Sequence, residues 1–497
     1  MILALTLALA HAEDWAAWGR TMERNMVSPE VPPATFAPGT FKPGTEEVDP
    51  LTAQGLKWVA TLGSQSYGNP TVAHGKVLVG TNNQREYRPG VVGDYSLVLA
   101  FDEQKGTLVW QHSTPKMGSG RVNDWEFLGI CSSPTVQEDR VLFVTNRGEV
   151  VAVDLDGMAD GNQGVQDEPA RMAAVGKPAP EPHPLDADVL WAYDMPKELG
   201  VFPHNITSNS VLLYDDFVMA VTSNGVDWSH IDLPSPFAPA YVLLDAKTGA
   251  YKAEEGVGIS ERTMHSNWSS PTWVPAHGGN PAQVVFGAGD GFLYGFEPVP
   301  VDQGGLKVLK ERWRIDGNRA DYREKDGAKI DYPKFDGPSE FIGTPVYADG
   351  MVYAMIGQDP EHGPGVGRLT AVDPTHPEKP AWTYDAITRS ISTPVVFDGV
   401  VYAPDYDGRL HAVDAKSGTP LWVHDTRAHI WGSPMVAGGK VYLGDEDGVL
   451  TVFKAGRSLV VEQEVAFPAP IYSSPILANG VLYVATQTHL YAFDGHR

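Results

Sequence analysis

Residues 392–422 read STPVVFDGVVYAPDYDGRLHAVDAKSGTPLW, and this stretch decides the fold. It contains four short apolar runs that are separated by three turn signals, among them Asp407-Gly408 and the segment 414–418. An Asp-Gly pair between alternating apolar runs is typical of a hairpin, because glycine readily adopts the positive φ that the turn requires. The stretch therefore predicts a unit of four short antiparallel strands.

The same unit recurs along the whole chain. Its opening can be aligned at eight positions, namely Pro70, Pro134, Ser210, Pro271, Pro345, Pro394, Pro434 and Pro475. The closest copies are 40 residues apart, which four strands and their turns fill, and the longer spacings indicate loop insertions. One such unit cannot bury both of its faces, so the copies must stack around an axis. The sequence predicts an all-β, eight-bladed β-propeller of four-stranded blades.

The two ends of the chain predict how the ring closes. The eighth copy ends at Arg497 without a fourth strand, and residues 56–61, LKWVAT, have the composition of the missing strand. Pairing the two would remove an exposed sheet edge. We therefore expect a signal peptide at 1–12, an extended lead-in at 13–50 lying on the outside, and a propeller at 51–497.

Two recurrent features of the copies are interpreted as structural. Tryptophans in the predicted fourth strands, Trp110, Trp191, Trp313, Trp382 and Trp422, are expected to seal each blade against the next. The acidic pairs Asp405/Asp407 and Asp445/Asp447 resemble calcium ligands, but turn chemistry explains them equally simply, and we prefer it.

Composition excludes several classes of protein. The chain has 62 acidic against 37 basic residues, and its net charge of −25 would repel nucleic acid. The single cysteine, Cys131, excludes an intrachain disulfide and a cysteine-rich metal site, and we expect it to be a small core residue.

The first twelve residues, MILALTLALAHA, have the apolar run and small-residue end of a secretory signal. No later stretch is long and apolar enough to predict a transmembrane segment. We expect a secreted protein in the periplasm or outside the cell, with peripheral attachment to the outer membrane as an open alternative.

The repeat resembles the pyrroloquinoline-quinone (PQQ) type of propeller repeat. That repeat is shared by quinoprotein alcohol dehydrogenases and by the non-enzymatic lipoprotein of the outer-membrane β-barrel assembly machine. Four segments are also similar to a group of exported bacterial propellers of this type: 24–28 (RNMVS), 123–134 (NDWEFLGICSSP), 200–205 (GVFPHN) and 357–363 (GQDPEHG). The resemblance predicts the fold strongly and the chemistry weakly.

In each blade, the turn that leads into the first strand and the turn between the second and third strands emerge on the same face of the ring. We call this face the funnel face and expect a ligand site there. Loops of this class are long and gather polar and aromatic side chains. The candidate ligand-binding residues are His204, Asn205, Asn224, His230, His265, Asn267, Trp268, Gln358, Glu361, His362, Arg389 and Trp431. The insertion at about 155–188 is expected to emerge on the opposite face as a solvated loop.

Several chemistries remain open for these residues. His204, His230, His265 and His362 could converge on a metal ion, although they show no local ligand spacing such as HExxH, and they could equally bond loop backbone. Arg389 is the residue that best suits an anionic ligand, because its planar fork binds carboxylate or phosphate.

The sequence favours an exported, monomeric binding or scaffolding propeller without catalysis, which takes a small molecule or a protein on its funnel face. The alternative is a quinoprotein dehydrogenase with PQQ and calcium, in which Asp227 or Asp359 would be the catalytic base. Against it, the cysteine pair found in many such enzymes is impossible with one cysteine. A glycan binder using Trp228, Trp268 and Trp431 is a third class.

Overall fold

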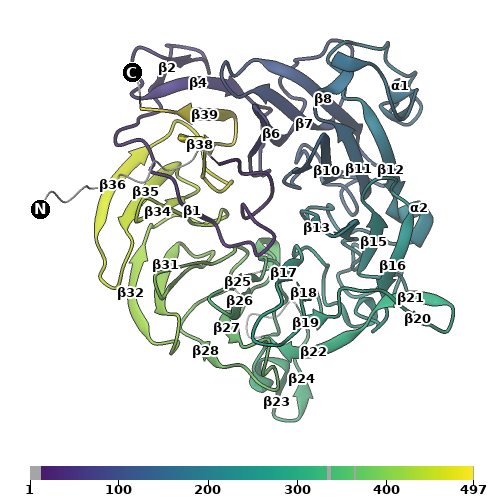
Figure 1. Ribbon diagram of the computed structural model, residues 1–497, viewed down its shortest axis with the longest axis vertical. Helices are drawn as coiled ribbons and strands as arrows, with labels where there is room; N and C mark the ends of the chain where they lie inside the picture. Colours follow the sequence, from purple (N-terminus) through teal and green to yellow (C-terminus); the bar gives the residue numbers. More distant parts are fainter. Residues whose placement is uncertain (1–12, 333–336, 363–364, 496–497) are drawn as a thin grey trace, which may run out of the picture.

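The computed structural model describes residues 13–332, 337–362 and 365–495, and it forms a ring of eight four-stranded blades (Figure 1). The expected signal peptide at 1–12 lies outside the described residues. The four strands of each blade are antiparallel, and the first of them, three residues long, lies on the side of the axis. The predicted all-β, eight-bladed architecture is confirmed.

The first four blades run from residue 71 to residue 316. Blade one contains β5 (Thr71–Ala73), β6 (Lys76–Asn82), β7 (Tyr95–Asp102) and β8 (Leu108–Pro115). Blade two contains β9 (Thr135–Gln137), β10 (Arg140–Val144), β11 (Glu149–Asp154) and β12 (Val189–Asp194). Blade three contains β13 (Leu212–Tyr214), β14 (Phe217–Val221), β15 (Tyr241–Asp245) and β16 (Tyr251–Glu255), and the hairpin β20 (Val301–Gln303) and β21 (Leu306–Leu309) extends it. Blade four contains β17 (Thr272–Val274), β18 (Gln283–Gly287), β19 (Phe292–Phe296) and β22 (Glu311–Asp316).

The other four blades complete the ring. Blade five contains β25 (Val346–Ala348), β26 (Met351–Ile356), β27 (Arg368–Val372) and β28 (Trp382–Tyr384). Blade six contains β29 (Val395–Phe397), β30 (Val400–Pro404), β31 (Arg409–Asp414) and β32 (Pro420–Asp425). Blade seven contains β33 (Met435–Ala437), β34 (Lys440–Gly444), β35 (Val449–Lys454) and β36 (Val461–Ala466). Blade eight contains β37 (Ile476–Ala478), β38 (Val481–Ala485), β39 (His489–Phe493) and β4 (Leu56–Thr61).

Several short elements lie outside the four strands of each blade, and the strand Val27–Ser28 among them pairs in parallel with β33 of blade seven. They are β1 (Val27–Ser28), the hairpin β2 (Thr40–Phe41) and β3 (Val48–Asp49), the hairpin β23 (Glu324–Lys325) and β24 (Ala328–Lys329), the helices α1 (Glu168–Arg171), α2 (Met195–Leu199) and α3 (Ala320–Arg323), and the 3₁₀ turns η1 (Gly157–Asp160), η2 (Ser260–Arg262) and η3 (Pro360–His362). No helix among the described residues is long and apolar enough to cross a membrane.

The ring closes as the sequence predicts. Strand β4 pairs antiparallel with β39, so that Trp58 lies opposite Ala492. The indole nitrogen of Trp58 donates to the carbonyl oxygen of Glu103 in blade one at 2.9 Å. Trp110, Trp382 and Trp422 donate in the same way to a carbonyl at the edge of the next blade. These three fourth-strand tryptophans and Trp58 therefore bond blade to blade, as expected, whereas Trp313 donates to Gln283 of its own blade.

A chain of hydrogen bonds explains the Ser/Thr-Pro opening of each repeat. The backbone N–H of Thr393 donates to the hydroxyl of Ser433, and the N–H of Ser433 donates to the hydroxyl of Ser474. Equivalent bonds join other neighbouring blades. In this chain Ser210 is equivalent to the serine and Val211 to the proline, so the sequence alignment of Ser210 with the prolines was wrong by one residue.

The lead-in does not lie wholly outside, because residues 13–28 run through the centre of the ring (Figure 1). Backbone bonds join this segment to the first strands of blades one, two, four, five and seven, while the side chains of Arg24 and Asn25 bond blades three, four and six. Asn479 of blade eight donates to Glu13. The expectation of an outside position is therefore wrong for residues 13–28. They carry buried apolar side chains, Trp15, Trp18 and Met26, that fill the channel.

The insertion at 155–188 also differs from the expectation of a solvated loop. It packs along the outer edge of blade one, where the N–H of Gln111 donates to the carbonyl oxygen of Leu185. Asp186 forms a buried ion pair with Arg88 at 2.6 Å. Met172 and Glu168 within it are buried. The insertion is therefore packed structure over part of its length.

Candidate functional site

A cavity of about 500 Å³ opens on the axis of the ring, above the segment that fills the channel. Trp18 of that segment lines it and donates from its indole nitrogen to the hydroxyl of Thr344 at 3.1 Å. The hydroxyl-bearing residues of the blade-to-blade chain, including Ser210, Ser433 and Ser474, line it as well. The floor is thus an indole surrounded by hydroxyl groups.

The wall of this cavity follows the repeat. The residue three positions before the repeat proline, or before Val211 in blade three, lines the cavity in every blade: Tyr67, Cys131, Ser208, Trp268, Ile342, Ile391, Trp431 and Tyr472. Only Trp268 and Trp431 were predicted as site residues. The register of the repeat was the signal that could have identified the rest, since equivalent residues of a closed ring must face one axis.

One side of the wall is aromatic. Tyr67 and Tyr472 stack with ring centroids 4.8 Å apart, and Trp431 approaches both at 5.7 and 5.5 Å. Trp125 lines the cavity as well. Cys131 is half-buried and lines this cavity, so the expectation of a plain core residue is wrong. Burial raises the pKa of its thiol to about 12, so it is protonated at neutral pH.

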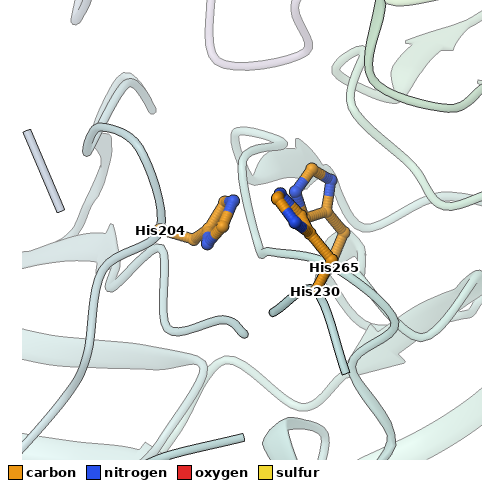
Figure 2. A group of neighbouring side chains, drawn as sticks. All are labelled: His204, His230 and His265. Atoms are coloured by element: carbon orange, nitrogen blue, oxygen red, sulfur yellow. The ribbon is translucent and has the colours of Figure 1, made fainter. Parts of the chain in front are cut away.

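Beside the cavity, four imidazole rings meet. His204 and His265 lie with centroids 4.4 Å apart, and His230 lies 5.0 and 5.2 Å from them. His362 lies 4.5 Å from His230 and 4.6 Å from His265. Figure 2 shows the rings of His204, His230 and His265 turned toward one another. One ligand nitrogen from each of these three lies within 4.8 Å of the others.

The four histidines come from three blades. His204 and His265 precede the first strands of blades three and four, while His230 and His362 lie between second and third strands of blades three and five. All four loops therefore belong to the funnel face. The convergence that the sequence left open is present in the structure.

His204 and His265 are fully buried, and each uses one ring nitrogen only. Nδ1 of His204 donates to the carbonyl oxygen of Val226 at 2.6 Å, and Nδ1 of His265 lies 3.0 Å from the Tyr332 hydroxyl. The Nε2 atom of each ring has no hydrogen-bond partner among the described residues. Burial lowers the pKa of His204 to about 4, and burial with three neighbouring histidines holds that of His265 well below its usual range. Both rings are neutral at pH 7.

A buried carboxyl group stands behind His265. Glu340 is fully buried, and its Oε1 lies 3.7 Å from Nδ1 of His265. Burial raises the pKa of Glu340 well above its usual range. On the other side, Oδ1 of Asp359 lies 3.5 Å from Nδ1 of His362. Neither Tyr332 nor Glu340 was predicted, because both act through His265 and carry no motif of their own.

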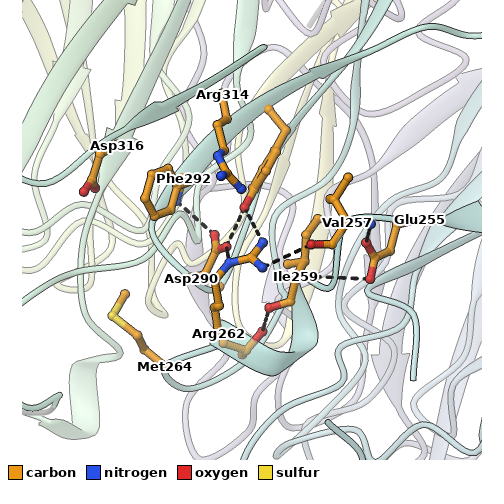
Figure 3. A network of polar contacts seen from close by, with 12 residues as sticks. Glu255, Val257, Ile259, Arg262, Met264, Asp290, Phe292, Arg314 and Asp316 are labelled. Atoms are coloured by element: carbon orange, nitrogen blue, oxygen red, sulfur yellow. Dashed lines mark hydrogen bonds and ion pairs between the residues drawn. The ribbon is translucent and has the colours of Figure 1, made fainter. Parts of the chain in front are cut away.

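A polar network fixes the loop that carries His265 (Figure 3). The guanidinium group of Arg262 binds Asp290 at 3.2 Å and the hydroxyl of Tyr294 at 2.9 Å, and it donates to the carbonyl oxygen of Val257 at 3.1 Å. Tyr294 also donates to Asp290 at 2.6 Å. The turn η2, three residues before His265, is thereby anchored to the third strand of blade four.

Several other predicted site residues hold loops together. Asn224 accepts from the N–H of Phe202 and donates to Ser235, and Asn267 joins Asn224 to Gly289. Gln358 donates to Pro338. These three side chains are fully buried and none of them lines the cavity.

The remaining candidates divide between the cavity and its surroundings. Asn205, Asp359 and Glu361 line the cavity. Asp227 binds Ser229, whose hydroxyl lowers the pKa of Asp227, and it does not line the cavity. Arg389 is buried with its guanidinium group 4.5 Å from the Tyr406 ring centroid, and it also does not line the cavity. It therefore has no place in an anion site within this cavity.

The aspartates at the predicted turns stabilise those turns by accepting backbone hydrogen bonds. Asp405 and Asp445 each accept the N–H of the residue four positions later, and the intervening Gly408 and Gly448 adopt φ of +102° and +80°. This is the turn chemistry that we preferred over calcium binding.

The cavity can be compared with the requirements of PQQ, which carries three carboxylate groups. No lysine or arginine is among the described residues that line it, whereas Asp359 and Glu361 are. The three carboxylates would find no cationic side chain there, and only a bound cation such as the calcium of the dehydrogenase hypothesis could offset their charge. The side chains of the cavity by themselves therefore do not fit PQQ.

The fold and the repeat define this chain as a PQQ-type propeller. It belongs to the family described as outer membrane protein assembly factor BamB, whose model matches residues 52–183 and 365–494, more than half of the chain. The four histidines lie between these two matched stretches. A search of curated proteins finds no sequence relative.

Solved structures share the fold at low sequence identity. BamB from Moraxella catarrhalis is 14% identical, with a TM-score of 0.54 over 88% of this chain and 99% of that one. A europium-containing methanol dehydrogenase is 11% identical, with a TM-score of 0.57 over 97% and 98%. A quinohemoprotein alcohol dehydrogenase from Pseudomonas putida HK5 is 13% identical, with a TM-score of 0.56 over 98% and 81%. At such identity the likeness concerns the fold alone.

Proposed function

We propose that the protein is an exported, monomeric and non-catalytic binding propeller that takes a small neutral or cationic molecule in its funnel cavity. The single observation that carries this proposal is the composition of the cavity wall. It combines an aromatic side of Tyr67, Trp431 and Tyr472 with a floor of hydroxyl groups, and it has no cation among its described residues. Aromatic faces and a few placed polar groups are the usual means of holding such a ligand.

Membership of the BamB family supports a binding role over a catalytic one, and a protein segment is a second kind of occupant for the same face. The family description also supports export to the periplasm and a place near the outer membrane. The dehydrogenase alternative is disfavoured because its anionic cofactor finds no lysine or arginine among the described residues that line the cavity.

The first experiment addresses catalysis. Purified protein is incubated with calcium and PQQ and assayed for dye-linked oxidation of a panel of alcohols and sugars. We expect neither binding of PQQ nor activity. Cofactor-dependent oxidation that is lost in Asp359→Asn would overturn the non-catalytic proposal in favour of the dehydrogenase.

The second experiment addresses the cavity. Neutral oligosaccharides, cellopentaose and maltopentaose, and a choline salt are titrated against the protein while tryptophan fluorescence is followed. We expect at least one of them to bind wild type, and Trp431→Ala to weaken that binding by about tenfold or more, as loss of an aromatic platform does. Trp228→Ala is the matched control, because Trp228 is 58% exposed and does not line the cavity. Equal effects of the two variants, or no binding by any of these probes, would contradict the proposed cavity.

A further inference from the structure

Two ring nitrogens of the histidine cluster lack a partner in the part of the chain that the structure describes, although the rings lie side by side. Nε2 of His204 and Nε2 of His265 are buried without a hydrogen-bond partner among the described residues. A buried polar atom without a partner costs about 1–3 kcal/mol, and such atoms are rare in native proteins. The ring centroids of His204 and His265 lie 4.4 Å apart, and a single ion bound by both Nε2 atoms would give each of them a partner.

The hydrogen bonds of these rings also prepare them as ligands. Because a carbonyl oxygen can only accept, Nδ1 of His204 carries the proton and its Nε2 keeps a free lone pair. Nδ1 of His265 faces the Tyr332 hydroxyl and, at 3.7 Å, the Glu340 carboxyl group. Metal-bound histidines show this arrangement, in which the outer ring nitrogen is held by a carbonyl or carboxyl group and the inner one binds the ion.

His230 supplies a third nitrogen from the accessible side. It is half-buried, in contrast to the other two, and its ring lies about equally far from both. The three ligand nitrogens lie within 4.8 Å of one another, whereas two nitrogens bound to one tetrahedral zinc ion lie about 3.3 Å apart. Binding one ion would therefore require the rings to turn and draw their nitrogens closer together, and His230, which is only half-buried, has the most freedom to do so.

We propose that His204, His230 and His265 bind a divalent transition metal ion of the borderline class, such as Zn²⁺. Three neutral imidazoles suit zinc and copper and suit calcium or magnesium poorly, since those ions prefer oxygen ligands. Asp359 lies beside the cluster, 3.5 Å from His362, and would offset part of the charge of the ion, while the carboxyl group of Glu340 lies 3.7 Å from the outer nitrogen of His265. Three protein ligands would leave room for a further one, and His362 is at hand, with its ring 4.5 Å from that of His230 and 4.6 Å from that of His265.

This site is separate from the proposed cavity ligand. Trp268 lies between the two, since it lines the cavity and its ring stands 4.8 Å from that of His265. The metal site would exist whether or not the cavity binds an organic molecule, so failure of one proposal does not remove the other.

The test uses untagged full-length protein that has been stripped with a chelator. Zn²⁺ affinity and stoichiometry are measured by competition with a chromophoric chelator, and Co²⁺ is added separately to follow its visible absorption. We expect one Zn²⁺ per chain and an intense Co²⁺ absorption band typical of a four- or five-coordinate site with nitrogen ligands.

Two variants probe the ligands. His265→Gln and His230→Ala should each lower Zn²⁺ affinity by about tenfold or more. Mutation of residues that merely hold metal ligands in place already lowers metal affinity by about tenfold to a hundredfold. His230 is half-buried, so His230→Ala is expected to fold even if His265→Gln does not. The matched control is His277→Ala, because His277 is exposed in the loop between β17 and β18.

The proposal has two outcomes that would overturn it. One is wild-type protein that binds no Zn²⁺ after stripping. The other is an equal Zn²⁺ affinity of His230→Ala and the control His277→Ala, when thermal unfolding shows that both variants are folded. In the latter case the bound ion would be adventitious only.

Discussion

Arg24 donates a hydrogen bond from its guanidinium group to the carbonyl oxygen of Val211 at 2.8 Å, across 187 positions of sequence. The same group donates to the carbonyl oxygens of Pro271 and Trp18 at 3.0 and 2.8 Å. Arg24 is fully buried, and burial lowers its pKa to about 9. One side chain thus joins blades three and four to the segment that fills the channel.

The first prediction concerns this side chain. Arg24→Met keeps an apolar stem of similar length but removes the donors of three buried carbonyl groups. Each unsatisfied group costs about 1–3 kcal/mol, so we expect the free energy of unfolding to fall by about 3 kcal/mol or more. Urea unfolding of both proteins measures the difference. Arg20→Met is the control, since Arg20 is half-buried and its guanidinium group donates to one backbone carbonyl, that of Val27, and to the side chain of Glu13. Equal losses in the two variants would contradict a special role for Arg24.

The second prediction concerns the chain of hydroxyl groups. Ser433→Ala removes the acceptor of the buried N–H of Thr393 while leaving the N–H of Ser433 bonded to Ser474. We expect a loss of about 1–3 kcal/mol in stability. Ser433→Thr retains the hydroxyl and should lose less. A neutral effect of Ser433→Ala in thermal and urea unfolding would show that water replaces the bond.

A third prediction compares the two turn aspartates at different pH. Burial raises the pKa of Asp445 to about 6, and the N–H of Val449 offsets this only in part. At Asp405, burial also acts to raise the pKa, but bonds from His411 and Arg409 outweigh it and lower the pKa below its usual value. Asp405 and Asp445 occupy equivalent turns in blades six and seven, yet the pKa of Asp405 is lowered and that of Asp445 is raised.

The sign of each contribution follows from linkage. Asp445 destabilises the fold when ionised, so Asp445→Asn should raise stability relative to wild type at pH 7.5, and the gain should shrink as the pH falls through 6 toward 4. Asp405 stabilises the fold above its unfolded pKa, so Asp405→Asn should be most destabilising at pH 7.5 and recover at low pH. Urea unfolding of the three proteins at pH 4.5 and 7.5 measures this, and parallel pH profiles for the two variants would disprove the assignment.

The repeat determines most of the fold because its chemistry is local. Each Asp-Gly turn and each Ser/Thr-Pro opening can be read within one copy, so the blades, their number and the closing strand β4 were all predictable. The path of residues 13–28 was not, because its backbone bonds reach all round the ring and follow no period. Three buried apolar residues, Trp15, Trp18 and Met26, were the signal against an outside position.

The sequence predicted only on which face of the ring the candidate site lies. Loop class placed His204, His230, His265 and His362 on one side of the ring, but their convergence depends on the relative position of three blades. The sequence could not show that Arg389 stacks on Tyr406, because that contact joins side chains from different turns. The cavity wall could have been found from the register of the repeat, three residues before each repeat proline.

The account places a metal site on the funnel face of blades three to five, beside the cavity on the axis. Anomalous X-ray diffraction at the zinc edge, from crystals of chelator-treated protein soaked in zinc chloride, tests this most directly. The account predicts one strong peak between the imidazoles of His204, His230 and His265. Zinc found only at exposed histidines such as His277 and His376, with no density inside the cluster, would contradict it.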